Sequence, residues 1–194
     1  MKTDIILSGV GGQGILSIAA IIGEAALANG LNMKQAEVHG MSQRGGDVQS
    51  NLRISSGPIS SDLIPYGKAD LIISLEPMEA LRYLPYLNKN GWIVTNSTPF
   101  INIPEYPETE TIMNELKKIH NTIILDVDGI AKEVGSPRTA NTVILGAASP
   151  FIGIPYEQLE AGIRNIFGKK GEQIVEMNIK ALAAGRKVAD RFEQ

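Results

Sequence analysis

The sequence predicts a single-domain α/β protein with a three-layer, Rossmann-like fold built on a mostly parallel mixed sheet. Three observations carry this prediction. Short apolar runs typical of buried strands alternate with longer helical patterns along the chain. The length of 194 residues suits one domain with a sizeable core. No internal repeat or low-complexity linker marks a boundary, so residues 1–194 are expected to form one domain.

The chain opens with a strand and a helix. Residues 4–8 are an apolar run, and residues 14–29 have a helical composition that Asn29 and Gly30 would end. This helix is apolar on nearly every side, whereas a helix that covers one face of a sheet needs only one apolar stripe. We therefore expect it to be covered on both sides, with another chain as one source of the cover. The same reasoning predicts self-association when the chain is expressed alone.

The next segment predicts a strand, a turn and a second strand. Residues 33–38 suit a strand and lead into a glycine-rich turn at 39–46. Residues 48–55 then alternate between apolar and polar side chains, the two-residue period that is typical of a strand with one solvent-exposed face. Because Ser56, Gly57 and Pro58 follow, a hairpin with residues 59–61 is expected.

The rest of the chain continues the alternation of strands and helices. Prolines 99, 104 and 107 forbid regular ladder pairing and indicate a surface excursion between residues 98 and 110. The predicted strands are 70–75, 91–96 and 122–126, and the predicted helices are 77–87, 112–119, 128–134, 140–148, 156–167 and 173–191.

Composition excludes several classes of protein. The formal net charge is −3 and both signs are interspersed, so the sequence shows no basic patch of the kind that binds nucleic acid. The chain has no cysteine, so it can carry no disulfide and no cysteine-bound iron–sulfur cluster. The apolar N-terminal stretch is broken by glycines and is shorter than the roughly 20 residues that a membrane span needs. We expect no membrane partner and a cytoplasmic location.

The stretch GVGGQG at residues 9–14 satisfies the pattern G-x-G-x-x-G between a strand and a helix. Glycines there allow close backbone approach, and the first amides of the helix favour an anionic group such as a phosphate. A dinucleotide site would also need an acidic residue near the end of the second strand, where Glu37 stands. A self-sufficient NAD(P)-dependent dehydrogenase and a non-catalytic nucleotide-binding adaptor are thus alternative functions. The glycines could also serve helix–strand packing alone.

A second motif, HGMSQRGG at residues 39–46, makes a dinucleotide-binding function less favoured. A dinucleotide-binding domain continues from its second strand into a crossover helix, not into a Gly-Gly turn and another strand. GVGGQG followed by HGMSQRGG, with ANTVILGA at 140–147, resembles the gamma-type subunit or domain of the 2-oxoacid:ferredoxin oxidoreductases, especially the indolepyruvate-specific branch. The resemblance covers essentially the whole chain.

The resemblance implies a complex that oxidatively decarboxylates 2-oxoacids with thiamine diphosphate, coenzyme A and ferredoxin. This chain lacks the thiamine-binding pattern, a Gly-Asp-Gly followed further on by Asn-Asn, and it lacks cysteine. A larger partner subunit is therefore expected to hold thiamine diphosphate and the iron–sulfur clusters. The chain alone is expected to be inactive.

The expected site is an anion site that helps to place coenzyme A. The two glycine-rich turns offer backbone donors, and the Arg44 guanidinium adds a cation. His39 is expected to be structural, and no metal is expected at Glu37, Asp47, Asp126 and Asp128 because strand-end carboxylates are commonly helix caps. No residue of this chain is assigned a catalytic role. The expected binding residues are Gly9, Gly11, Gly12, Gln13, Gly14, Ser42 and Arg44.

Overall fold

Six strands form one sheet in the part of the chain that the computed structural model describes, residues 1–39, 45–101 and 103–192. Their order across the sheet is β2-β3-β1-β4-β5-β6. The strands are β1 (Lys2–Val10), β2 (Asn32–His39), β3 (Asp47–Ser55), β4 (Ala69–Ser74), β5 (Leu87–Asn96) and β6 (Thr122–Leu125).

The sheet is mixed but mostly parallel, as predicted. Strands β1, β4, β5 and β6 pair in parallel, while β3 pairs antiparallel with both β1 and β2. Among the described strands, β3 alone therefore runs against the others. The C-terminal ends of β1, β2, β4, β5 and β6 all meet at one edge, where binding sites of α/β sheets are usually found.

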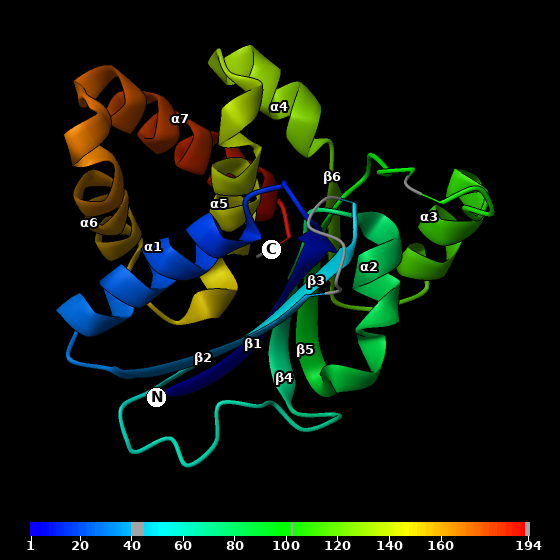
Figure 1. Ribbon diagram of the computed structural model, residues 1–194, viewed down its shortest axis with the longest axis horizontal. Coiled ribbons are helices and arrows are strands. Elements are labelled where there is room, and N and C mark those ends of the chain that lie inside the picture. Colours follow the sequence, from blue (N-terminus) through cyan, green and yellow to red (C-terminus); the bar gives the residue numbers. More distant parts are fainter. Residues whose placement is uncertain (40–44, 102, 193–194) are drawn as a thin grey trace.

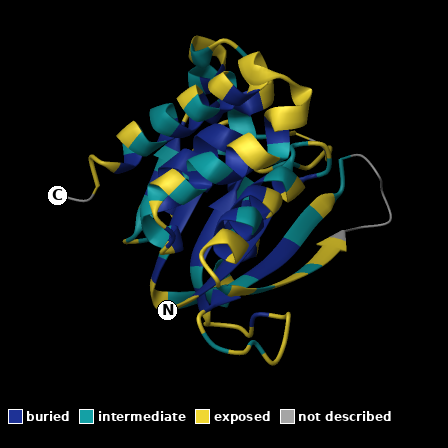
Figure 2. Ribbon diagram, turned by 90° about the vertical axis from the view of Figure 1, so that its left-hand side faces the viewer, coloured by how far each residue is buried: buried dark blue, intermediate teal, exposed yellow. Residues whose placement is uncertain are grey.

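Helices cover both faces of the sheet and give the three predicted layers (Figure 1). Side chains alternate between the faces, so Ile5 and Leu7 face one core while Ile6 faces the other. Figure 2 shows helices with exposed outer surfaces packed over buried strands. One face carries α1 (Ile15–Ala28), α4 (Val127–Val134), α5 (Ala140–Ile152), α6 (Tyr156–Phe167) and α7 (Glu172–Ala189), and the other carries α2 (Pro77–Arg82) and α3 (Thr109–Lys117).

The apolar helix α1 is covered on both sides by its own chain. It packs on the sheet with one side and against α6 with another. The approach is close, since a Cβ at Gly162 would lie 2.9 Å from the Ile21 carbonyl oxygen, and Asn165 Nδ2 donates to Glu24 Oε1 at 3.0 Å. Double cover was predicted correctly, but α6 supplies it. The apolar character of α1 therefore gives no reason to invoke a second chain.

The predicted hairpin of β3 with residues 59–61 is wrong. Both edges of β3 are already occupied, by β1 on one side and β2 on the other. Residues 56–68 instead form a loop that the Arg53 Nη1 group holds by donating to the carbonyls of Ser61 and Leu63, each at 3.0 Å. A strand with two partners has no free edge for a third.

Several helix ends differ from the prediction, and two of these differences involve a proline. The helix expected over 77–87 ends at Arg82, and a 3-10 turn, η1 (Leu84–Tyr86), follows and contains Pro85. Helix α5 passes Pro150 and ends at Ile152, beyond the predicted residue 148. Proline cannot donate to the Gly146 carbonyl, but the Ser149 hydroxyl does so at 2.7 Å, which compensates for the lost helical bond.

Candidate functional site

The glycine loop, residues 9–14, joins the C-terminal end of β1 to α1. Gly14 is the N-cap of α1 and has φ +83°, which side-chain-bearing residues rarely adopt. A Cβ at Gly9 would lie 2.7 Å from Gln13 Oε1 and 2.9 Å from Ile15 Cδ1. Positive φ therefore favours glycine at both positions, and at Gly9 a Cβ would also displace neighbouring side chains.

The Gln13 side chain shapes this loop from within. Its Oε1 accepts from Val10 N at 2.7 Å, and its Nε2 donates to the Leu75 carbonyl at 3.1 Å, just beyond the end of β4. The loop is therefore tied to the neighbouring strand. Within the described residues, the backbone amides of Gly12, Gly14, Ile15 and Leu16 have no acceptor.

The loop opens onto a pocket of about 440 Å³ between the start of α1 and the starts of α4 and α5. Helix N-termini carry partial positive charge, so this position suits an anionic group. The pocket is lined by Gly12, Gln13, Gly14, Leu75, Asn96, Asp128, Pro137, Arg138, Ala140 and Asn141.

Two lining residues that the sequence analysis missed are asparagines. Asn96 ends β5, where its Nδ2 donates to Asp128 Oδ2 at 2.9 Å and its Oδ1 accepts from Val127 N at 3.2 Å. Asn141, in the first turn of α5, donates from Nδ2 to the Gly14 carbonyl at 3.3 Å. A polar residue at the end of a buried strand was a signal for Asn96. For Asn141 the only signal in the sequence was its position in the motif ANTVILGA.

The described residues on either side of the second glycine-rich turn lie at the same edge of the sheet, since β2 ends at His39 and β3 begins at Asp47. Gly11 N donates to the Gly46 carbonyl at 2.9 Å, and β2 ends there at His39. Ser42 and Arg44 lie outside the described residues, as does the side chain of His39. Gly46, two positions after Arg44 in sequence, thus lies next to the glycine loop.

The strand order disagrees with a dinucleotide site. In that fold the second strand lies beside the first, so its terminal acidic residue faces the ribose. Here β3 lies between β1 and β2, which sets β2 about 10 Å from β1 at the usual spacing of neighbouring strands. Glu37 is exposed on the edge strand β2. The strand order therefore speaks against the alternative of a dinucleotide site that Glu37 would complete.

The four carboxylates considered as metal ligands do not form a common site: three bond different partners, and the fourth lies on the edge strand. Asp126 caps α4 by accepting from Gly129 N at 2.8 Å, Asp128 bonds Asn96, and Asp47 accepts from the Tyr83 hydroxyl at 3.4 Å. Glu37 lies on the edge strand. Within the described residues, no cluster of three or more His, Asp or Glu side chains could hold a metal ion, and no helix is long and apolar enough to cross a membrane.

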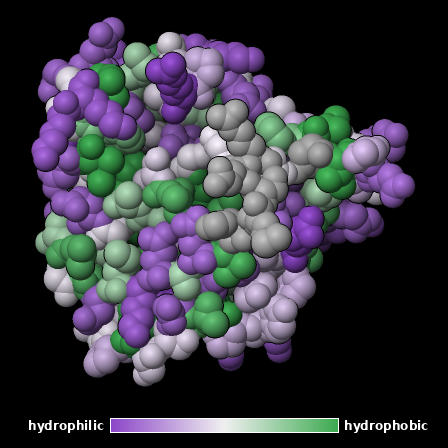
Figure 3. Space-filling model, viewed as in Figure 1, coloured by the Kyte–Doolittle hydropathy of each residue, from purple (hydrophilic) through white to green (hydrophobic). Residues whose placement is uncertain are grey.

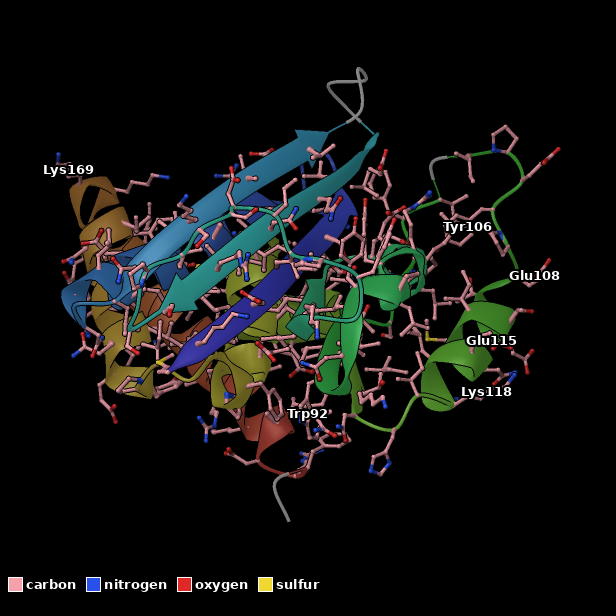
Figure 4. The ribbon with its side chains drawn as sticks, turned by 90° about the horizontal axis from the view of Figure 1, so that it is seen from below. Trp92, Tyr106, Glu108, Glu115, Lys118 and Lys169 are labelled. Atoms are coloured by element: carbon pink, nitrogen blue, oxygen red, sulfur yellow. The ribbon has the colours of Figure 1, made fainter. Side chains whose placement is uncertain are left out.

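Two buried acids organise the other side of this edge. Glu76 caps α2 by accepting from Glu79 N at 2.8 Å, and it also accepts from Phe100 N at 3.3 Å and from the Tyr106 hydroxyl. Burial raises the pKa of Glu79, although Arg82 donates to it at 2.9 Å. Figure 4 shows Tyr106 on the segment that leads to α3. Glu76 thus fastens that segment to the end of the sheet.

Known proteins match the chain over nearly its whole length. Residues 4–188 match the family described as pyruvate ferredoxin/flavodoxin oxidoreductase. The indolepyruvate oxidoreductase subunit IorB of Archaeoglobus fulgidus is 40% identical over 194 residues, which is 95% of this chain and 94% of that subunit. The IorB subunit of Thermococcus kodakarensis is 38% identical over 196 residues, with 96% of this chain and 95% of that subunit covered.

Solved structures show the same fold. The gamma subunit of a keto/oxoacid ferredoxin oxidoreductase from Geobacter sulfurreducens has a TM-score of 0.72 and 26% identity, with 97% of this chain and 99% of that chain covered. The 2-oxoglutarate:ferredoxin oxidoreductase from Magnetococcus marinus, solved with 2-oxoglutarate, coenzyme A and succinyl-CoA bound, has a TM-score of 0.78 and 23% identity. That alignment covers 98% of this chain and 31% of the longer chain.

Proposed function

The chain belongs to the pyruvate ferredoxin/flavodoxin oxidoreductase family, and from this premise we propose that it is the small subunit of a heteromeric 2-oxoacid:ferredoxin oxidoreductase that prefers indolepyruvate. The complex would oxidatively decarboxylate the 2-oxoacid to an acyl-CoA and reduce ferredoxin. The observation that carries this proposal is the identity of 34–40% to four IorB subunits along almost the full length of the chain. Residues 1–194 would form one gamma-type domain, in a cytoplasmic complex.

In this proposal the chemistry is divided between subunits. The larger partner would hold thiamine diphosphate and the iron–sulfur clusters, because this chain has neither cysteine nor the thiamine-binding pattern. Ferredoxin would be the electron acceptor of the whole complex. The IorB relatives are subunits by name, which supports assembly of this chain with other chains.

The part that this chain plays would be to place coenzyme A. Support comes from the pocket at the glycine loop, where the amides of Gly12, Gly14, Ile15 and Leu16 have no acceptor within the described residues and the dipole of α1 favours an anion. A similar fold was solved with coenzyme A bound. We propose that the backbone of Gly9, Gly11, Gly12, Gln13 and Gly14, together with Ser42 and Arg44, forms this site. The Gln13 side chain, engaged at both ends, would shape the loop.

Replacement of Arg44 by alanine tests this assignment. Loss of a charge-assisted contact, worth about 1.5–3 kcal/mol, should raise the KM for coenzyme A in the reconstituted complex by roughly 10- to 150-fold. The thiamine content should not change, because the partner holds that cofactor. Arg164→Ala is the matched control, since Arg164 is half-exposed on α6. An unchanged KM for coenzyme A in a correctly assembled Arg44→Ala complex would contradict the proposed placement.

A further inference from the structure

The turn that presents the unpaired amides has an anchor outside its own sequence. The carbonyl oxygen of Gly14 accepts from Ser17 N at 3.0 Å, as the first bond of α1, and also from Asn141 Nδ2 at 3.3 Å. Asn141 belongs to α5 and is 127 positions away in sequence. One carbonyl thus joins the start of α1 to the start of α5, on the wall of the pocket.

This turn needs such an anchor more than most helix starts do. A helix usually begins at Ser, Thr, Asp or Asn, whose side chain bonds an amide of the first turn and holds the cap in place. The N-cap of helix α1 is Gly14, which has no side chain to make a cap bond, and none is present within the described residues. Glycine is also the residue with the widest backbone freedom. Without an external contact, Gly14 would have little to hold it at its positive φ.

Asn141 fits this role by both its contact and its position. A Cβ on Gly14 would lie 3.0 Å from Asn141 Nδ2, so the carboxamide lies directly over the glycine. Gln13 performs the corresponding task on the other side of the loop, through Val10 N and the Leu75 carbonyl. The glycine loop is therefore held between two carboxamides, one internal and one supplied by α5.

We propose that Asn141 is a positioning residue: it holds Gly14 in its left-handed conformation so that the amides of residues 14–16 stay directed at the pocket. The inference rests on the proposed function only in naming coenzyme A as the ligand whose binding these amides serve. The amides would remain present without Asn141, but they would sample orientations in which they cannot bind one anion together.

Hydrogen exchange of the full chain tests the positioning role without any ligand. In Asn141→Ala the amides of Gln13 and Ser17 should exchange about fivefold faster, the effect of losing one neutral hydrogen bond. Asn141→Asp keeps the shape of the side chain and removes the donor, so it should behave like Asn141→Ala if the hydrogen bond matters. Asn165→Ala is the control, because Asn165 makes a similar carboxamide bond, to Glu24 at the other end of α1. Unchanged exchange in both Asn141 variants would overturn the inference.

Kinetics of the reconstituted complex then separate this inference from the proposed function. Asn141→Ala should raise the KM for coenzyme A about fivefold with kcat and thiamine content unchanged, and Asn165→Ala should leave all three unchanged. If Arg44→Ala raises the KM for coenzyme A and Asn141→Ala does not, the positioning role fails and the proposed function stands. If neither variant changes this KM, placement of coenzyme A by this chain and the role of Asn141 in it both fail.

Discussion

At the scale of single residues, side-chain amides and acids organise the C-terminal edge of the sheet. Gln13 and Asn141 hold the glycine loop from two sides, and Asn96 joins the end of β5 to the start of α4. Glu76 does the same for the segment before α3, through Phe100 N and the Tyr106 hydroxyl. Each of these side chains bonds backbone groups at the ends of strands and helices, where regular pairing stops.

The buried Glu79 makes stability depend on pH. Its pKa is raised in the folded chain by burial, so the folded state keeps a proton over a pH range in which the unfolded chain has lost it. Its contribution to the free energy of unfolding is therefore fully present below the ordinary pKa of about 4.5 and declines as the pH rises through the raised value. Glu79→Gln should remove this decline, as measured by urea unfolding between pH 4 and 7.

Glu115→Gln serves as the control for this prediction, because Glu115 is exposed on α3. It should leave the pH dependence of stability close to that of the wild type. Parallel stability curves for Glu79→Gln and the wild type would show that Glu79 does not titrate as its burial requires.

At the scale of secondary-structure elements, close helix contacts hold together the layer that supports the site. Helices α5 and α7 cross where a Cβ at Gly146 would lie 2.0 Å from the Leu182 carbonyl oxygen, and one at Gly185 only 1.9 Å from the Val143 carbonyl oxygen. Backbone thus meets backbone with no room for a methyl group. Because α5 also carries Asn141, this contact helps to place the wall of the pocket.

Gly185→Ala should destabilise the chain by about 3 kcal/mol, since two helix backbones would have to separate. For a chain of this size the expected fall in Tm is about 6–12 °C, measured by thermal unfolding. Gly168→Ala is the matched control, because a Cβ there meets nothing within 4 Å and the backbone is helical. A Tm for Gly185→Ala within about 2 °C of the wild type would mean that the α5–α7 contact adapts at little cost.

At the scale of the whole molecule, the fold places a pocket at the glycine loop and leaves apolar residues exposed elsewhere. Phe100, Ile101 and Ile103 are exposed on the segment between β5 and α3, and Figure 3 shows hydrophobic surface on that side. Exposed apolar groups of this kind are common at subunit contacts. Self-association of the isolated chain stays a prediction. The apolar surface of α1 no longer supports it, because α6 of the same chain covers that helix.

The isolated chain should not turn over indolepyruvate. Supplied with thiamine diphosphate, coenzyme A and oxidised ferredoxin, it should release no carbon dioxide above the background, because the proposed division of labour places the reactive cofactor in the partner. Co-expression with the large subunit should restore release of carbon dioxide and reduction of ferredoxin, each followed directly. Turnover by the chain alone would contradict the proposed division between subunits.

Much of the fold was determined by local sequence alone. Apolar runs, helical periodicity and turn residues predicted the α/β class, the strand 4–8 within β1, and the helices 156–167 and 173–191 closely. Such features depend on residues near one another in the chain, so periodicity and turn chemistry report them. The glycine loop was found for the same reason, because its conformation depends on adjacent glycines.

Tertiary structure decided what depends on partners distant in sequence. The position of β3 between β1 and β2 excluded the hairpin at 59–61 and separated Glu37 from the glycine loop. Cover of α1 came from α6, and Asn141 reached Gly14 across 127 positions. A local pattern predicts which groups need a partner, such as an apolar face or an uncapped glycine turn. Only the packing of the whole chain selects the partner, because that choice depends on which elements are brought into contact.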